Sequence, residues 1–300
     1  MNAGRVFTEK YLRLMFKSLR DATPDEVMEE LEHCRRESRR PVRVPRYFRG
    51  YFTEEKFNAS TGFEMQVFRH DEGSRKVILY LHGGAFIYPP VFFHWRFLHD
   101  LCLRTHCDAL LPVYPKSPEY TCEFSVKTVL DFYKNISESK LYEEIHLVGD
   151  SAGACLCLIV AQEAHKNGWQ KPTTTTLLSP CVDLSHTKEA AMRALQDKDT
   201  MLQLDRVITL NAIWQGDLPV KHPWVSPVFG DFSGVDNLNV YFGSDEILQP
   251  DDLFLKETYE KAGKTGQFHE YEGMFHTFAM FPIPEGFRAV KEMAKTIMNQ

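Results

Sequence analysis

The chain has 300 residues, 43% of them hydrophobic and 25% charged, which is typical of a soluble globular protein. Its formal net charge of −6 argues against nucleic acid or an anionic membrane as a partner. No stretch approaches the ~18 apolar residues needed to span a bilayer, so we expect no membrane-spanning helix.

Residues 1–45 have a helical pattern, with Tyr11, Leu12, Leu14, Met15 and Leu19 available for one apolar face. Residues 1–17 lack the continuous apolar stretch and small-residue cleavage site of a signal peptide, so we predict a cytoplasmic protein. Seven cysteines are an odd number, and their spacing suits neither a metal site nor a disulfide framework. Buried free thiols are therefore expected.

Between residues 76 and 181, apolar strand-like runs alternate with helix-like runs. The strand-like runs are residues 77–81, 109–113, 145–148 and 174–178. The helical runs are about residues 94–105, 123–135 and 152–165. Near-continuous apolarity within the strands indicates burial on both faces, as in a parallel sheet. The pattern predicts an α/β fold with a mostly parallel, doubly wound central sheet flanked by helices.

Residues 184–222 interrupt this alternation and include a helical stretch at 201–214. We expect this insertion and residues 1–45 to pack together as a helical cap over the carboxyl edge of the sheet, where such folds bind ligands. The predicted core is then made of residues 46–183 and 223–300.

The segment Gly149-Asp150-Ser151-Ala152-Gly153 joins the strand at 145–148 to the following helix. It matches the G-x-S-x-G nucleophile elbow in the strand–turn–helix context that this motif requires. The helix N-terminus after Ser151 presents free N–H groups to a developing negative charge. Ser151 is the predicted nucleophile.

The strand at 77–81 leads into His82-Gly83-Gly84. Acyl transfer needs two or three backbone N–H groups directed at the oxyanion, and consecutive glycines let the backbone approach a substrate closely. We expect these donors to be the N–H groups of Gly83, Gly84 and Ala152. His82 is expected to orient the loop rather than carry a proton.

A serine at its ordinary pKa needs a neighbouring base. His276 is the last of twelve histidines, and it follows the strand-like residues 268–271 and precedes a terminal helix from about residue 285. In this fold the order is serine, acid, histidine, so we predict His276 as the base. The acid should follow the strand at 238–243, where Asp245 and Glu246 are adjacent; only one of them can orient the imidazole.

Together these residues resemble the hormone-sensitive-lipase-like family of α/β-hydrolase esterases, of the Gly-Asp-Ser-Ala-Gly type. The matching segments are residues 82–84, 114–120, 149–153, 179–183 and 273–278. The resemblance implies hydrolysis of short-chain carboxylic esters without a cofactor, under a cap like the one predicted above. It departs from the family at Ala85, where a third glycine is usual. The family's acid often stands two residues before a leucine, which favours Glu246 over Asp245.

Aromatic residues next to the oxyanion segment and in the insertion are numerous enough to wall an apolar substrate pocket. Phe86, Tyr88 and Trp214 are the candidates. An amidase, formamidase or deacetylase would use the same triad, and a non-catalytic ligand-binding protein of this fold is the alternative of another class. We expect no metal site. The natural ester and the oligomeric state remain open.

Overall fold

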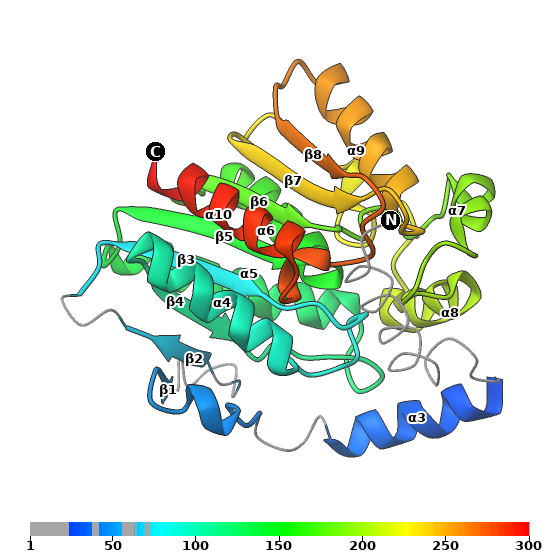
Figure 1. The fold of residues 1–300 in the computed structure, drawn as a ribbon, viewed down its shortest axis with the longest axis horizontal. Coiled ribbons are helices and arrows are strands. Elements are labelled where there is room, and N and C mark those ends of the chain that lie inside the picture. The colour runs from blue at the N-terminus through cyan, green and yellow to red at the C-terminus, as the bar shows by residue number, and fades with distance from the viewer. Residues whose placement is uncertain (1–23, 38–41, 56–62, 64, 70–72, 300) are drawn as a thin grey trace.

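The computed structural model describes residues 24–37, 42–55, 63, 65–69 and 73–299 (Figure 1). Its strands are β1 (Phe52–Glu55), β2 (Met65–Phe68), β3 (Lys76–Leu81), β4 (Asp108–Pro112), β5 (Glu144–Asp150), β6 (Thr174–Leu178), β7 (Leu238–Gly243) and β8 (Gln267–Tyr271). Its helices are α3 (Pro24–Glu37), α4 (Phe92–Thr105), α5 (Cys122–Ser139), α6 (Ala152–Lys166), α7 (Glu189–Leu195), α8 (Leu204–Gln215), α9 (Gln249–Lys261) and α10 (Pro284–Met298). Three short 3₁₀ helices are η1 (Arg46–Phe48), η2 (Pro227–Phe229) and η3 (Phe278–Met280).

The described strands form one sheet in the order β1-β2-β4-β3-β5-β6-β7-β8. β1 and β2 are antiparallel to their neighbours, and all pairings from β4 to β8 are parallel. In the register of β3 with β5, Leu81 lies opposite Gly149. The segments that follow these two strands therefore start at the same edge of the sheet.

Each face of the sheet is covered by helices (Figure 1). Helices α4 and α10 pack on one face with Trp95, Leu98 and Met293 among the buried side chains. Helices α5, α6 and α9 share a second core on the other face. Because β3 and β4 are buried on both faces, they carry apolar residues at every position after the first. The predicted α/β fold is confirmed.

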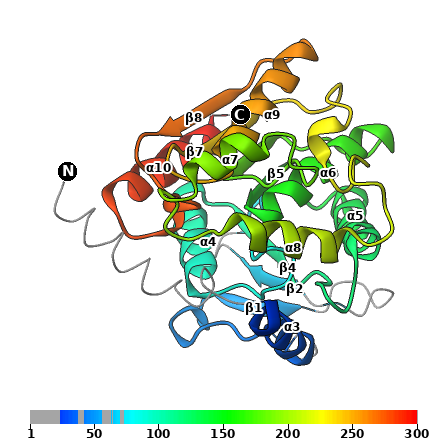
Figure 2. The ribbon, with the colours of Figure 1, turned by 90° about the vertical axis from the view of Figure 1, so that its right-hand side faces the viewer.

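Helices α7 and α8 lie beyond the carboxyl ends of the parallel strands, and α3 lies beside α8 (Figures 1 and 2). The apolar face of α3, with Val27 and Leu31, packs against Leu210 of α8 and against Ile87, in the loop after β3. This packing joins the N-terminal segment, the 184–222 insertion and the loop after β3 around one region of the molecule.

All six strands expected from the sequence are present, but β1 and β2 were not predicted. Each has only four residues, which is too short for a periodic pattern to stand out. Helix α8 begins at Leu204 and not at residue 201, because the Asp199 carboxylate accepts the N–H groups of Met201 and Leu202 and holds them in a turn.

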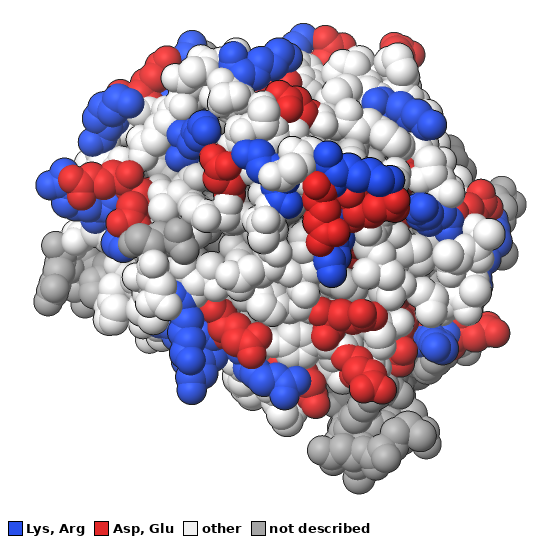
Figure 3. Space-filling view, turned by 90° about the horizontal axis from the view of Figure 1, so that it is seen from above, with Lys and Arg blue, Asp and Glu red and all other residues white. Residues whose placement is uncertain are grey.

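Part of the cap prediction falls outside the described residues. Residues 1–23 and 38–41 are not described, so the expected apolar face with Tyr11, Leu12, Leu14, Met15 and Leu19 lies outside the structure. All seven cysteine side chains are buried. On the face seen in Figure 3, positive and negative side chains are interspersed.

Candidate active site

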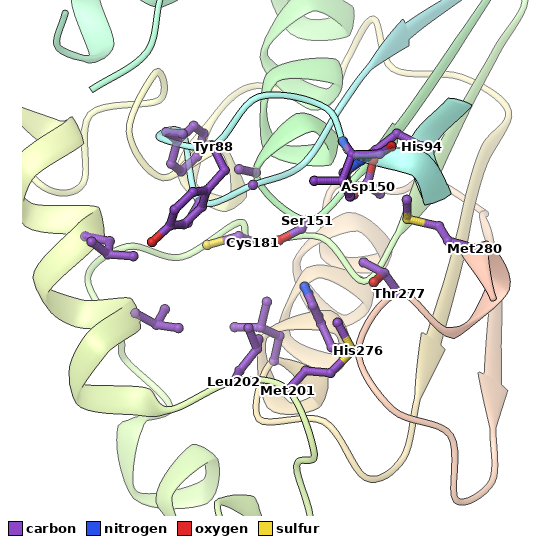
Figure 4. A pocket seen from close by; sticks show the side chains of 18 of the residues that line it. Tyr88, His94, Asp150, Ser151, Cys181, Met201, Leu202, His276, Thr277 and Met280 are labelled. Carbon is purple, nitrogen blue, oxygen red and sulfur yellow. Dashed lines mark hydrogen bonds and ion pairs between the residues drawn. The ribbon is translucent and has the colours of Figure 1, made fainter. Parts of the chain in front are cut away.

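Ser151 sits in a sharp turn between β5 and α6, with φ of 50° and ψ of −120°. The turn is possible only with glycine on both sides of it. A Cβ added to Gly153 would come within 1.9 Å of the Leu81 carbonyl oxygen, and one on Gly149 within 2.7 Å of Gly153. The backbone N–H of Ser151 donates to the Leu178 carbonyl at 2.9 Å. This strained turn holds the serine side chain at the wall of a cavity (Figure 4).

His276 lies in the loop after β8, and Glu246 lies in the turn after β7. His276 Nδ1 is 2.6 Å from Glu246 Oε2, and both side chains are buried. The second oxygen, Glu246 Oε1, accepts hydrogen bonds from Ser179 Oγ at 2.9 Å and from the Gly243 N–H at 2.8 Å. The carboxylate is thus fixed on both oxygens, and one of them orients the imidazole.

The imidazole ring of His276 extends toward Ser151 (Figure 4). Within the described residues no hydrogen bond yet joins the two side chains. Such bonds are often long until substrate binds. Burial alone would lower the pKa of His276, but its hydrogen bond to Glu246 and the negative charges of Glu246, Asp199 and Asp150 raise it above the ordinary value.

Asp245, the alternative acid, precedes Glu246 in the same turn. Its side chain accepts a hydrogen bond from Ser244 Oγ at 3.2 Å, while its N–H donates to the Met274 carbonyl. Asp251 and Asp252 lie fully buried in the first turn of α9. Burial raises the pKa of both carboxyls well above the usual range.

One expected oxyanion donor, Gly83 in the loop after β3, has to be replaced. The N–H of Gly83 donates to Asp150 Oδ1 at 3.0 Å, so it is already used inside the protein. Gly84 and Ala85 line the cavity with Ser151 and Ala152, and Gly83 is not part of that wall. The backbone at Gly84 and Ala85 has positive φ, 117° and 52°. This turn presents Gly84 and Ala85, the two residues after Gly83, to the cavity.

Asp150 is the anchor of that loop. Besides Gly83, it accepts a hydrogen bond from Tyr80 Oη at 2.5 Å, and His94 Nε2 lies 3.5 Å from its Oδ2. Burial would raise the pKa of Asp150, but His94, Tyr80 and the Gly83 N–H hold it below its usual range. His82 is fully buried, its Nδ1 lies 2.6 Å from the Gly83 carbonyl oxygen, and burial lowers its pKa well below the ordinary value.

The cavity in front of Ser151 has a volume of about 360 Å³. Its walls are largely apolar and come from the loop after β3, the 201–211 region and the loop after β8. Phe86 and Tyr88, two of the three candidate pocket residues, line it. Trp214 does not: it is fully buried in the core and stacks on Phe86, with ring centroids 3.6 Å apart. Trp214 therefore supports a pocket residue from behind.

Among the described residues, no group of three or more His, Cys, Asp or Glu side chains is arranged to hold a metal ion. Nor does any described helix combine the length and the apolar character needed to cross a bilayer.

A protein-family profile described as alpha/beta hydrolase fold matches residues 78–280. An esterase of Acinetobacter venetianus is 30% identical over 224 residues, which cover 73% of this chain and 74% of that protein. An acetyl-hydrolase of Streptomyces hygroscopicus is 30% identical over 225 residues, covering 72% and 73%. The crystal structure of an esterase from the bacterial hormone-sensitive lipase family has a TM-score of 0.84, at 21% identity, over 100% of this chain and 99% of the other. At this identity, the similarity of the two structures shows that they share the fold.

Proposed function

The chain belongs to the alpha/beta hydrolase fold family, and we propose that it is a serine esterase acting on short-chain carboxylic esters. The observation that carries the proposal is the buried pair of His276 and Glu246, 2.6 Å apart, beside Ser151 in an apolar cavity. The relatives named esterase and acetyl-hydrolase support the same reaction class. We assign Ser151 as nucleophile, His276 as base and Glu246 as acid.

In the first half of the reaction, Ser151 Oγ attacks the ester carbonyl carbon while His276 Nε2 takes its proton. Glu246 stabilises the imidazolium through the hydrogen bond to Nδ1. We assign the oxyanion to the backbone N–H groups of Gly84, Ala85 and Ala152, since Gly83 donates to Asp150. Ala85 can serve in place of glycine because the donor is the backbone and its φ of 52° is already adopted.

The tetrahedral intermediate then collapses. Its carbon–oxygen bond to the alcohol breaks, and the imidazolium of His276 returns the proton to the departing alkoxide. Water enters the site, gives a proton to His276 and attacks the acyl-enzyme. A second tetrahedral intermediate releases the carboxylic acid and restores Ser151.

The limited volume of the cavity supports a preference for esters with a short acyl chain. Its roughly 360 Å³ are bounded by apolar side chains that include Phe86, Met201 and Leu202. Each added methylene contributes about 0.8 kcal/mol to binding while it meets apolar surface, and nothing once the wall is reached. The division into cap and core and the cytoplasmic location stay predictions.

The test has two parts. A fluorophosphonate probe should label wild-type protein on Ser151 and leave Ser151→Ala unlabelled; absence of labelling would favour a non-catalytic binding protein. Paired ester and anilide substrates with the same acyl group should then be compared. Faster turnover of the ester supports an esterase, whereas faster turnover of the anilide would make the protein an amidase with the same triad.

A further inference from the structure

A buried carboxylate outside the triad connects the pocket wall to the turn that carries the acid. Asp199 lies between α7 and α8 and has no exposed surface. Its Oδ1 accepts the backbone N–H groups of Met201 and Leu202, each at 2.8 Å. Its Oδ2 accepts the N–H of Ile247, also at 2.8 Å. Hydrogen bonds to an ionised carboxylate are roughly twice as strong as neutral ones. The Asp199 carboxylate therefore holds these three backbone N–H groups strongly.

The two segments that meet at Asp199 have different tasks in the proposed reaction. Met201 and Leu202 line the cavity in which the substrate lies (Figure 4). Ile247 directly follows Glu246, the carboxylate bonded to His276. A single side chain therefore sets the distance between the wall that holds the acyl group and the acid that orients the base.

We propose that Asp199 is a positioning residue of the esterase, one that fixes the position of the substrate wall relative to the turn that carries Glu246. This inference rests on the function proposed above. The geometry is specific, since three backbone N–H groups from these two turns converge on one buried carboxylate.

The charge of Asp199 also acts on the base. The charged groups that face His276 are Glu246 from the turn after β7, Asp199 from the α7–α8 segment and Asp150 from the end of β5. All three raise the pKa of His276, against the effect of burial. Burial raises the pKa of Asp199 itself, and its three N–H donors and the nearby His276 oppose that rise. Removing the charge should therefore lower the pKa of His276.

The experiment measures kcat, KM and the pH profile of kcat/KM with p-nitrophenyl butyrate, together with the rate of fluorophosphonate labelling. Asp199→Asn keeps the shape of the side chain but places an amide N–H₂ against one backbone donor. We expect kcat to fall ~10- to 100-fold, as for a small misplacement of catalytic groups. The acid limb of the profile should move to lower pH. Asp199→Glu retains the charge at a different length, so the limb should stay near the wild-type position while kcat remains reduced.

Asp183→Asn is the matched control. Asp183 is equally buried, but the hydrogen bonds that its carboxylate accepts from described residues come from its own turn, from the N–H and hydroxyl groups of Ser185 and Thr187. Its loss should lower the melting temperature and leave the acid limb unmoved.

The inference is overturned if folded Asp199→Asn has wild-type kcat and an unmoved limb, or if Asp183→Asn shifts the limb equally. If Asp199→Asn does not fold, wild-type kcat in Asp199→Glu overturns it. A wild-type protein that neither hydrolyses the ester nor takes the label would instead refute the proposed function.

Discussion

Replacing Glu246 by glutamine tests the triad most directly. The change preserves the size of the side chain but replaces one carboxylate oxygen with an N–H₂ group. If that group faces His276 Nδ1, the ring is driven to the tautomer that carries its proton on Nε2, where it cannot accept one from Ser151. If it faces the other way, it meets the hydroxyl of Ser179 and the N–H of Gly243, which now both donate to Glu246 Oε1.

Either orientation removes the carboxylate charge from a buried imidazole 2.6 Å away. Loss of the corresponding acid in a serine triad lowers kcat by about 10⁴. At 1.36 kcal/mol for each factor of ten, this is about 5 kcal/mol of transition-state stabilisation. We expect a loss of ~10³- to 10⁴-fold for Glu246→Gln, measured as initial rates of p-nitrophenyl butyrate hydrolysis on protein shown to be folded by its melting curve.

The matched control is Asp245→Asn, one residue earlier in the same turn. Its carboxylate accepts a hydrogen bond from Ser244, whereas His276 Nδ1 is paired with Glu246, so we expect kcat within about three-fold of wild type. Glu246→Gln with more than a tenth of wild-type kcat would refute the assignment of the acid. A crippled Asp245→Asn beside an active Glu246→Gln would transfer the role to Asp245.

Three further predictions follow from the same site. Ser151→Ala and His276→Ala should each lower kcat by ~10³-fold or more, because the triad acts as a unit; near-normal turnover by either folded variant would contradict its role. The reaction needs neutral His276, whose pKa is raised, so kcat/KM should fall as the pH drops through a value above the ordinary 6.5, and a flat profile from pH 5 to 8 would argue against a histidine base. Specificity for p-nitrophenyl esters should rise from acetyl to a peak at a short chain and then decline, and Leu202→Ala should move the peak to a longer chain; better hydrolysis of long-chain triglyceride emulsions would show a lipase instead.

The central sheet could be predicted because its signal is local. A strand buried on both faces, such as β3, is a nearly continuous apolar run. The elbow around Ser151 combines a short motif with the strand and helix that it requires. Polar segments after β3, β5 and β7 had to meet at one edge because the strands are parallel. The fold and the position of the elbow between β5 and α6 were therefore accessible from the residues alone.

The oxyanion donors were not fully accessible, because they depend on a contact between distant residues. Gly83 and Gly84 both lack a side chain, and nothing in their local sequence separates them. The difference is that Asp150, 67 residues later, accepts the N–H of Gly83. A Cβ on Gly83 would also lie 2.2 Å from Asp150 Oδ2, so this glycine serves close packing. Trp214 was misassigned for a similar reason, since its ring stacks behind Phe86 rather than facing the cavity.

Carboxylates show this limit most clearly, because their sequence signal is the same while their surroundings differ. Asp183 bonds within its own turn, Asp150 anchors the loop after β3, and Asp199 joins the pocket wall to the acid turn. Asp251 is buried without a hydrogen-bond partner for its carboxyl oxygens among the described residues. Burial disfavours every ionised carboxylate, so the donors that surround each one decide whether it carries a charge and what that charge can do. At Asp199 those donors are three backbone N–H groups, whose position is set by the complete fold and by no short motif.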